Sequence, residues 1–393
     1  MEVQVSKLRE TLSLLEPVVP KKHTLPVLKF AHLGEGRAVA TDIEVAVSLE
    51  LPEAQEDLLL PVKGVLEFLN GVPGLLVARL TTEGKRVAIA ANFTRASWES
   101  ADPQDYPPIP RVEAEGEGVL DGTPLVKALV AVLPYASTED ARPILTGICL
   151  TLGAEMEAAA SDGFRLAWEK IPGRLAGEGN LIIPARAVSL LEGLWKKGAV
   201  PELGQAIDPV AMARAKRLIR LGWERKKALL EMRFGGILLT TQLIQGTYPN
   251  YRQLVPTETG TSVTVQAEDM LRALKQVSGV AKEASGIVRL RWEGETLTVS
   301  ARAAEVGETE VEIPARATGP GKTAVKWNYL LEYFSSRAGS VTLATASPSA
   351  PVTFSHRGTP HVVTMPMQVN WDTASPVPAT VAGPQRSRRK RAG

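Results

Sequence analysis

The sequence has few of the residues on which disulfide, metal and membrane functions depend. It contains 1 cysteine and 4 histidines among 393 residues. The single cysteine, Cys149, excludes an intramolecular disulfide and a thiolate zinc cluster, and it is typical of proteins kept in a reducing compartment. No stretch approaches the roughly 18 uninterrupted apolar residues of a transmembrane helix, and the first residues, MEVQVSKLRE, lack the apolar core of a signal peptide. We therefore expect a cytoplasmic protein without a metal or cofactor.

Net charge is also small, because acids and bases nearly cancel at +2. The last 21 residues carry no acid and five cations, Arg386, Arg388, Arg389, Lys390 and Arg391. Without these five, residues 1–372 have a net charge of −3. A slightly acidic body therefore precedes a short basic tail, 373–393, whose Pro/Ala-rich composition predicts disorder.

A pattern of helix, strand pair, helix and strand pair occurs three times. Leu8, Leu12 and Leu15 lie on one helical face, and branched residues with partial alternation predict the strands. Ala40–Asp42 and Ala160–Asp162 occupy matching places 120 residues apart. The predicted helices are 5–16, 59–72, 124–133, 181–197, 268–282 and 325–337; the main predicted strands are 24–33, 37–51, 85–100, 141–152, 156–171, 286–294 and 295–313.

Tyrosines among prolines mark the ends of the first two units, at 102–110 and 247–256. Proline favours extended connections because it fixes φ and disfavours helix before it. Units of this size are tandem domains and are too long for solenoid repeats. The sequence thus predicts an α+β fold with domains at 1–114, 115–257 and 258–372, followed by the tail.

The middle unit contains an extended basic segment near 205–233. Residues 211–233 include eight cations and two acids. Residues 228–234 alternate as a strand does, whereas 208–218 are compatible with a short inserted helix that periodicity alone does not establish. We assign this segment no role from the sequence.

No pattern of catalytic residues stands out. The histidines form no metal-binding pair, and 319–323 lacks the first glycine of a phosphate-binding loop, which favours a turn between strands. Asp42 and Asp162 are candidates for a general base. Their matching places in two repeats favour local turn hydrogen bonds instead, and Cys149 fits a small core residue. We expect a protein that is not an enzyme.

Cations recur outside the apolar faces of the predicted helices. A solvated helix surface explains any one of them, but recurrence in three units favours a common surface that contacts DNA phosphates without reading sequence. Few aromatic residues accompany them, so stacking of single-stranded bases is not indicated. The candidate DNA-contacting residues on these helices are Lys7, Arg9, Lys63, Lys127, Arg186, Lys196, Lys197, Arg272 and Lys275.

Several segments together resemble the bacterial DNA sliding clamp, the beta subunit of DNA polymerase III. They are KKHTLPVLKFAHL, ATDIEVAV, ARPILTGICL, SDGFRLA, LIIPARAVSLLEGL, QGTYPNYRQLVP and HVVTMPMQV. The resemblance covers 1–369 and implies three clamp-type domains, each with two helices packed on antiparallel sheets. It also implies that one chain forms half of a closed ring, a head-to-tail homodimer around double-stranded DNA. The implied protein partners are the replicative polymerase, the clamp loader and other proteins with a clamp-binding motif.

The resemblance further implies a pocket for extended partner peptides between the second and third domains. Leu145, Leu166 and Leu254 are also compatible with ordinary core packing, whereas the charge of Arg165 in an apolar strand requires a partner or a role. By matching position the pocket comprises Leu145, Ser161, Gly163, Phe164, Arg165, Leu166, Pro249, Gln253, Leu254, Val363, Met365, Pro366 and Met367.

The chain departs from the family pattern at several places. Phe164 stands where well-known members have histidine, and Gln253 stands where they have arginine, so the peptide preference is open. Lys22 matches a DNA-contacting arginine and is added to the DNA-contacting set; Glu139 is acidic where the family has a neutral contact, and it is left out. The family ends shortly after MPM, so the basic tail is either an electrostatic tether to DNA or a solvated tail or artificial remnant.

Three functions remain to be distinguished. The first is a processivity clamp, with a principal and an accessory clamp as variants. The second is a repeat-built scaffold that binds only protein. The third is an enzyme that uses Asp42 or Asp162.

Overall fold

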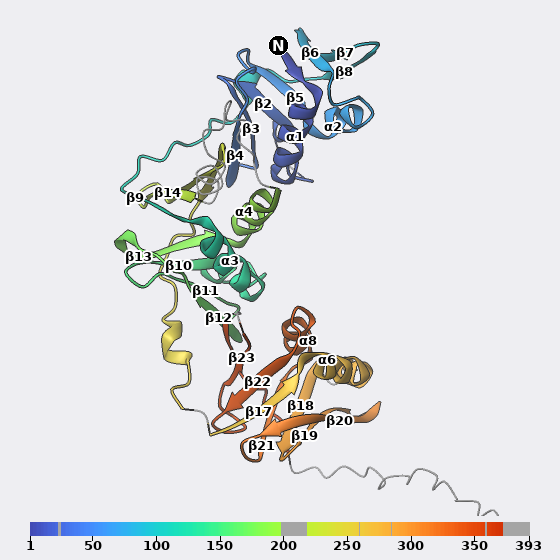
Figure 1. Ribbon diagram of the computed structural model, residues 1–393, viewed down its shortest axis with the longest axis vertical. Helices are drawn as coiled ribbons and strands as arrows, with labels where there is room; N and C mark the ends of the chain where they lie inside the picture. Colours follow the sequence, from blue (N-terminus) through green and yellow to red (C-terminus); the bar gives the residue numbers. More distant parts are fainter. Residues whose placement is uncertain (23–24, 198–217, 259, 284, 358–359, 372–393) are drawn as a thin grey trace, which may run out of the picture. The chain divides into compact units, whose positions relative to one another are not determined.

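The computed structural model describes residues 1–22, 25–197, 218–258, 260–283, 285–357 and 360–371 (Figure 1). The chain divides into two compact units, each described below by itself. Unit 1 contains 1–259 together with 340–344 and 351–365, and unit 2 contains 260–339, 345–350 and the residues from Pro366 onward. The predicted inserted helix lies almost wholly, and the basic tail entirely, outside the described residues.

Unit 1 begins with a sheet of four antiparallel strands in the order β1-β6-β7-β8. Its first strand is short and pairs with the middle of the chain's sixth strand, Val3 facing Ala78. The sheet therefore has two edges, β1 and β8. The strands are β1 (Glu2–Gln4), β6 (Val77–Glu83), β7 (Arg86–Ala91) and β8 (Thr94–Glu99).

A second sheet of eight strands joins the first two predicted domains in the order β5-β2-β3-β4-β16-β15-β14-β9. The junction is the antiparallel β4–β16 ladder, in which Val47 faces Leu239. The strands are β2 (Phe30–Gly34), β3 (Arg37–Thr41), β4 (Val45–Glu50), β5 (Leu58–Pro61), β9 (Gly116–Asp121), β14 (Leu218–Glu224), β15 (Leu229–Phe234) and β16 (Ile237–Gln242).

A further set of strands in unit 1 follows the order β13-β10-β11-β12-β24-β23-β22. In the β12–β24 ladder, Leu166 faces Val363, so residues almost 200 positions apart become neighbours. The strands are β10 (Gly147–Gly153), β11 (Glu157–Ser161), β12 (Arg165–Lys170), β13 (Leu175–Pro184), β22 (Ser340–Thr345), β23 (Val352–Ser355) and β24 (His361–Thr364).

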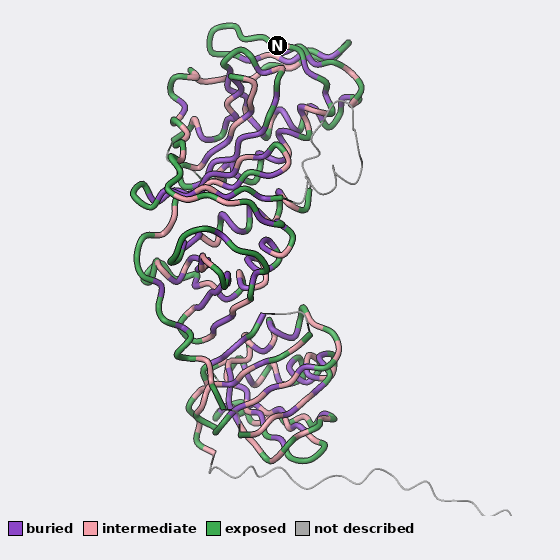
Figure 2. Tube along the Cα trace, turned by 60° about the vertical axis from the view of Figure 1, so that its left-hand side comes forward, coloured by how far each residue is buried: buried purple, intermediate pink, exposed green. Residues whose placement is uncertain are grey.

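Two pairs of helices complete unit 1. Helix α1 packs with α2, and α3 with α4. The predicted apolar face of the first helix is confirmed, because Leu8, Leu12 and Leu15 are fully buried (Figure 2), and removing such side chains from water is the main source of folding free energy. The helices are α1 (Val5–Leu15), α2 (Val62–Asn70), α3 (Gly122–Val132) and α4 (Ala185–Lys197).

Short 3-10 helices form at prolines and at the ends of α-helices. Proline suits such first turns because its φ is already helical and its missing N–H is not needed there. They are η1 (Glu16–Val18), η2 (Pro26–Lys29), η3 (Pro103–Asp105), η4 (Leu133–Tyr135), η5 (Pro143–Thr146) and η6 (Tyr251–Leu254).

Unit 2 repeats the combination of antiparallel strands and packed helices. Its strands follow the order β17-β20-β19-β18-β21, and α6 packs with α8. Trp292 and Phe334 are among the largest fully buried side chains. The elements are β17 (Thr261–Gln266), α6 (Ala267–Gln276), α7 (Ser278–Glu283), β18 (Ile287–Glu293), β19 (Thr296–Ala303), β20 (Gly307–Ala317), β21 (Gly321–Lys326) and α8 (Trp327–Ser335).

The α+β class and the recurring helix pairs are confirmed, whereas several predicted boundaries are wrong. The second helix starts at Val62, because Leu58–Pro61 pairs with β2. The predicted strand 141–152 starts only at Gly147, because Pro143–Thr146 forms a 3-10 helix. The turn predicted at 319–323 is shorter, since β21 begins at Gly321. No helix among the described residues is long and apolar enough to cross a membrane.

Candidate functional site

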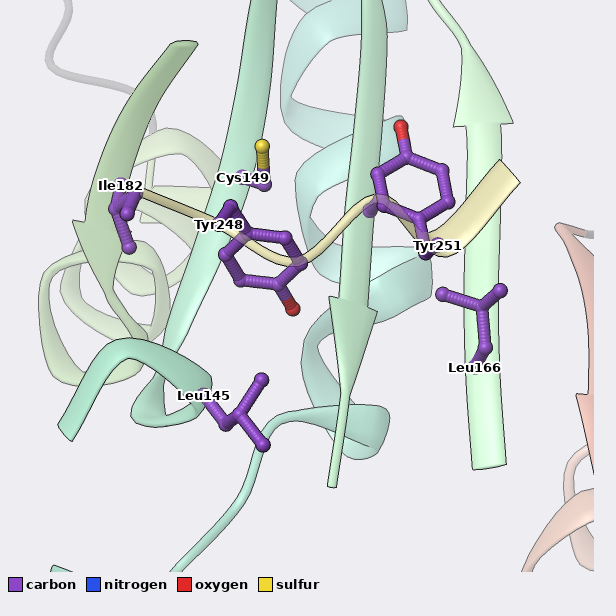
Figure 3. Packing of buried hydrophobic residues seen from close by; sticks show 7 residues of the cluster. Leu145, Cys149, Leu166, Ile182, Tyr248 and Tyr251 are labelled. Carbon is purple, nitrogen blue, oxygen red and sulfur yellow. The ribbon is translucent and has the colours of Figure 1, made fainter. Parts of the chain in front are cut away.

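A buried cluster lies beneath several of the predicted pocket residues in unit 1. Leu145 and Leu166 pack there with Cys149, Tyr248 and Tyr251. Figure 3 shows the two tyrosines on the connecting segment, lying against the strands that carry Cys149 and Leu166. Leu145 and Leu166 are therefore core residues and form the base of the candidate site.

Three other predicted pocket residues are apolar and exposed. Phe164, Leu254 and Met365 have exposed fractions of 52%, 46% and 37%. Phe164 and Met365 are neighbours, since the Met365 N–H donates to the Phe164 carbonyl oxygen over 2.8 Å. Large apolar side chains exposed beside a core are typical of sites that bind another molecule.

The remaining predicted members fall in different environments. Val363 is buried in β24 beside Leu166, and Pro249 and Gln253 are exposed on the connecting segment. Pro366 and Met367 belong to unit 2, where the Met367 N–H donates to the Ala324 carbonyl oxygen over 2.7 Å. Within unit 1 the structure thus brings one part of the predicted set together on β12, β24 and η6.

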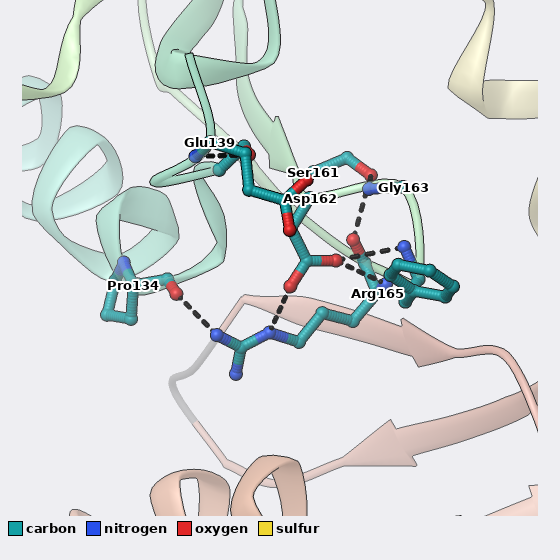
Figure 4. A network of polar contacts seen from close by, with 8 residues as sticks. Pro134, Glu139, Ser161, Asp162, Gly163 and Arg165 are labelled. Atoms are coloured by element: carbon teal, nitrogen blue, oxygen red, sulfur yellow. Dashed lines mark hydrogen bonds and ion pairs between the residues drawn. The ribbon is translucent and has the colours of Figure 1, made fainter. Parts of the chain in front are cut away.

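Arg165 has the partners that its charge requires. Its Nε donates to Asp162 Oδ2 over 3.0 Å, and its Nη2 donates to the Pro134 carbonyl oxygen over 2.8 Å (Figure 4). The guanidinium also lies 5.0 Å from the centre of the Tyr135 ring, a favourable cation–π arrangement. Arg165 therefore fixes the loop between β11 and β12 to the end of α3, beside the exposed Phe164.

The loop before Arg165 is a tight turn. Asp162 Oδ1 accepts hydrogen bonds from the N–H groups of Phe164 and Arg165, both over 2.9 Å. Gly163 has φ +91°, and a Cβ there would lie 2.6 Å from Arg142 Nη1. Ser161 Oγ accepts from the Gly163 N–H over 3.1 Å. Turn geometry thus aims Phe164 outward, and Arg142 is a neighbour that sequence reasoning missed.

Glu157 on β11 is a second residue that sequence reasoning missed. Its carboxylate is buried, accepts a hydrogen bond from the Tyr251 hydroxyl and lies 3.5 Å from Arg252 Nη2. Burial and this hydrogen bond both raise the pKa of Tyr251, and the carboxylate raises the pKa of Arg252. Glu157 therefore holds the start of η6, which carries Gln253 and Leu254. The repeated tyrosines among prolines were the available signal.

Burial also raises the pKa of the Tyr248 hydroxyl and raises that of the Cys149 thiol to about 12. Cys149 is fully buried, which confirms it as a core residue. Asp42 likewise makes local bonds, because its Oδ1 accepts from the Val45 N–H over 2.8 Å. The predicted turn role of Asp42 and Asp162 is therefore confirmed. Among the described residues no group of three or more His, Cys, Asp or Glu side chains is suited to a metal ion.

The predicted DNA-contacting cations divide by their surroundings. Four are paired with a carboxylate: Lys7 with Glu53, Arg186 with Asp42, Lys196 with Glu192 and Arg272 with Asp269. Arg9 and Lys197 donate to the carbonyl oxygens of Val72 and Ser13. The other four, Lys22, Lys63, Lys127 and Lys275, are exposed and make no ion pair with any described residue.

Comparison with known families matches two consecutive parts of the chain to one protein. The central domain of the DNA polymerase III beta subunit matches residues 120–250, and its C-terminal domain matches residues 252–369. A beta sliding clamp of Synechococcus elongatus is 24% identical over 383 residues, which is 93% of this chain and 98% of that protein. One from a Synechocystis strain is 26% identical over 347 residues, covering 83% and 88%.

Solved structures agree in fold. The DNA polymerase III beta subunit of Pseudomonas aeruginosa has a TM-score of 0.81 at 19% identity, covering 94% of this chain and 100% of that one. The sliding clamp of Bacillus subtilis has a TM-score of 0.78 at 18% identity, covering 94% and 99%. A clamp from Pseudomonas aeruginosa has also been solved bound to griselimycin. Because the two domain matches together span more than half of its residues, the chain belongs to the family of bacterial DNA polymerase III beta subunits, the DNA sliding clamps.

Proposed function

We propose that this chain is a DNA sliding clamp that tethers the replicative polymerase to duplex DNA as a ring of two copies. The observation that carries the proposal is the helix pair found with antiparallel strands three times, together with exposed cations on the helices. Lys63, Lys127 and Lys275 come from α2, α3 and α6, one from each predicted domain. Phosphate contacts of this kind are independent of base sequence and weak enough to allow sliding once the DNA is encircled.

Ring closure by two identical chains requires two different complementary edges on each chain. The edge strand β8 of unit 1 exposes Arg95. In unit 2, β20 pairs with β19 along Gly307–Pro314, whereas β17 pairs only with Ala315–Ala317. The other edge of Gly307–Ile313 is thus available, and it exposes Glu310 and Glu312. We propose that β8 of one copy pairs with β20 of the second copy, head to tail, because unpaired strand edges and opposite charges favour this contact.

The partner-peptide site is proposed at Phe164, Leu254 and Met365, above the base formed by Leu145 and Leu166. The occupant is an extended peptide with apolar anchors, since the exposed groups are apolar and the neighbouring charge of Arg165 is already paired. Phe164 and Gln253 make this site less basic than the family pattern. The clamp loader, the polymerase and other motif-bearing proteins are the proposed partners.

Several finer points belong to the same proposal. The chain is proposed to act without catalysis and without a cofactor, in the cytoplasm, with domains at 1–114, 115–257 and 258–372. The carboxylates considered for a general base, Asp42 and Asp162, are occupied by turn hydrogen bonds, which favours the non-enzymatic function. A protein-only scaffold is the second candidate, and it predicts no retention on DNA of any shape.

The decisive experiment loads the protein onto nicked circular DNA with its clamp loader and then linearises the DNA. A clamp stays on the circle and leaves through the free ends. Loss at the same rate from circular and linear DNA would overturn the topological mechanism, and no retention on either would favour the scaffold. Mass in solution gives a first test, because the ring requires about twice 42.2 kDa.

A further inference from the structure

A hollow of about 350 Å³ lies at one end of the strands of unit 2, away from the proposed peptide site of unit 1. There β18 ends at Glu293, β21 begins at Gly321 and β17 begins at Thr261. The loop 345–348 closes the remaining side. The hollow therefore lies wholly within unit 2.

The base of the hollow is apolar because a glycine leaves room beside an indole. A Cβ at Gly321 would lie 2.4 Å from Trp292 Cε2 and 2.6 Å from Thr261 Cγ2. Pro320, Ala346 and Pro348 also line the hollow. A small apolar side chain fits such a volume, whereas a charged group inside it would lose hydration without a partner.

The rim and the neighbouring face carry an excess of cations. On the outward face of β18 and β21 lie Arg289, Arg291, Lys322 and Lys326, against one carboxylate, Glu293. Arg291 and Lys322, which line the hollow, are directly opposite each other in the ladder. Like charges in this position are destabilising unless an anion lies between them.

The intramolecular contacts leave these charges without a carboxylate. Arg289 donates to the Asn370 carbonyl oxygen over 3.4 Å, and Lys326 donates to that of Ser285 over 2.9 Å. Lys322 lies 5.0 Å from the centre of the Trp371 ring. None of the four cations forms an ion pair with a described residue, and Arg291 makes no hydrogen bond to one.

We propose that this hollow, called here the rim site (Thr261, Arg291, Trp292, Gly321, Lys322 and Ala346), binds an acidic peptide segment of a partner protein. One apolar side chain enters the hollow, and carboxylates next to it in sequence pair with Arg291 and Lys322. Such pairs combine charge attraction with directed hydrogen bonds. A single-stranded nucleic acid fits less well, because binding of that kind relies on exposed aromatic faces. Trp292 is 1% exposed, and Lys322 covers one face of Trp371.

The test uses a labelled peptide, acetyl-Gly-Ser-Leu-Glu-Glu-Ser-Gly-amide, titrated with the full-length protein and followed by fluorescence anisotropy. We expect saturable binding that weakens as salt rises. Arg291→Glu should weaken it at least tenfold, and Ala346→Phe, which fills the hollow from an exposed loop position, should do the same. Arg316→Glu changes an exposed cation of β20 in the same unit and should leave the affinity unchanged.

Further arms separate the rim site from other surfaces. Leu254→Asp should not alter the affinity, since that residue belongs to the proposed site in unit 1. The peptide with both glutamates replaced by glutamine should bind at least tenfold more weakly. Equal affinity of the two peptides, or an Arg291→Glu affinity equal to that of the unaltered protein, would overturn the proposal. So would loss of oligo-dT binding in Arg291→Glu without any peptide binding, which would assign the cations to nucleic acid.

Discussion

At the scale of single residues, Glu157 connects the core of unit 1 to the proposed peptide site. Replacing it with alanine leaves the Tyr251 hydroxyl without its acceptor and Arg252 without its carboxylate. We expect a loss of about 1–3 kcal/mol in the free energy of unfolding, measured by urea denaturation, and weaker binding of a clamp-motif peptide.

Glu157→Gln is the matched variant, because it keeps an acceptor for Tyr251 while removing the charge. It should lose less stability than the alanine variant and retain most of the peptide affinity. If both variants bind the peptide as the unaltered protein does, Glu157 does not position η6.

Cys149 gives a second prediction at this scale. Its burial and its pKa of about 12 keep the thiol protonated and inaccessible near neutral pH, and the thiolate is the reactive form. Iodoacetamide at pH 8 should therefore leave the native protein unmodified and alkylate it once in denaturant, which intact-mass spectrometry measures. Rapid alkylation of the native protein would contradict the packing of this cluster.

At the scale of elements, the helix cations with no ion pair in the described residues should account for the salt dependence of DNA binding. Replacing Lys63, Lys127 and Lys275 with alanine should flatten the dependence of log affinity on log salt by about 0.9 per lost phosphate contact. Lys196→Ala is the control, because Glu192 already pairs with that lysine. An unchanged slope in the triple variant would exclude these helices from the DNA surface.

Local sequence patterns predicted some elements and missed others for physical reasons. The apolar period of Leu8, Leu12 and Leu15 suffices for α1, because a helix places these residues on one face. The start of α2 was missed because the pairing of Leu58–Pro61 with β2 is a tertiary contact. Within the candidate site, buried Leu145 and exposed Leu254 could not be distinguished from the sequence. The Glu157–Tyr251 contact joins residues 94 positions apart, a separation that no local pattern spans.

At the scale of the whole molecule, the proposed ring depends on charge complementarity between β8 and β20. Glu310→Lys or Arg95→Glu places like charges across the proposed contact, which costs affinity. We expect each change to raise the dimer dissociation constant by roughly tenfold or more, measured by sedimentation equilibrium, and to shorten retention on circular DNA. Glu117→Lys, on β9, changes the net charge equally and should affect neither quantity.

Combining Arg95→Glu with Glu310→Lys tests the contact itself, because the exchanged charges again attract across the two copies. The double variant should dimerise more tightly than either single variant, by an amount that falls as salt rises. If the two effects simply add, these residues do not face each other. The ring would then have to close through other edges, while topological retention on circular DNA could still hold.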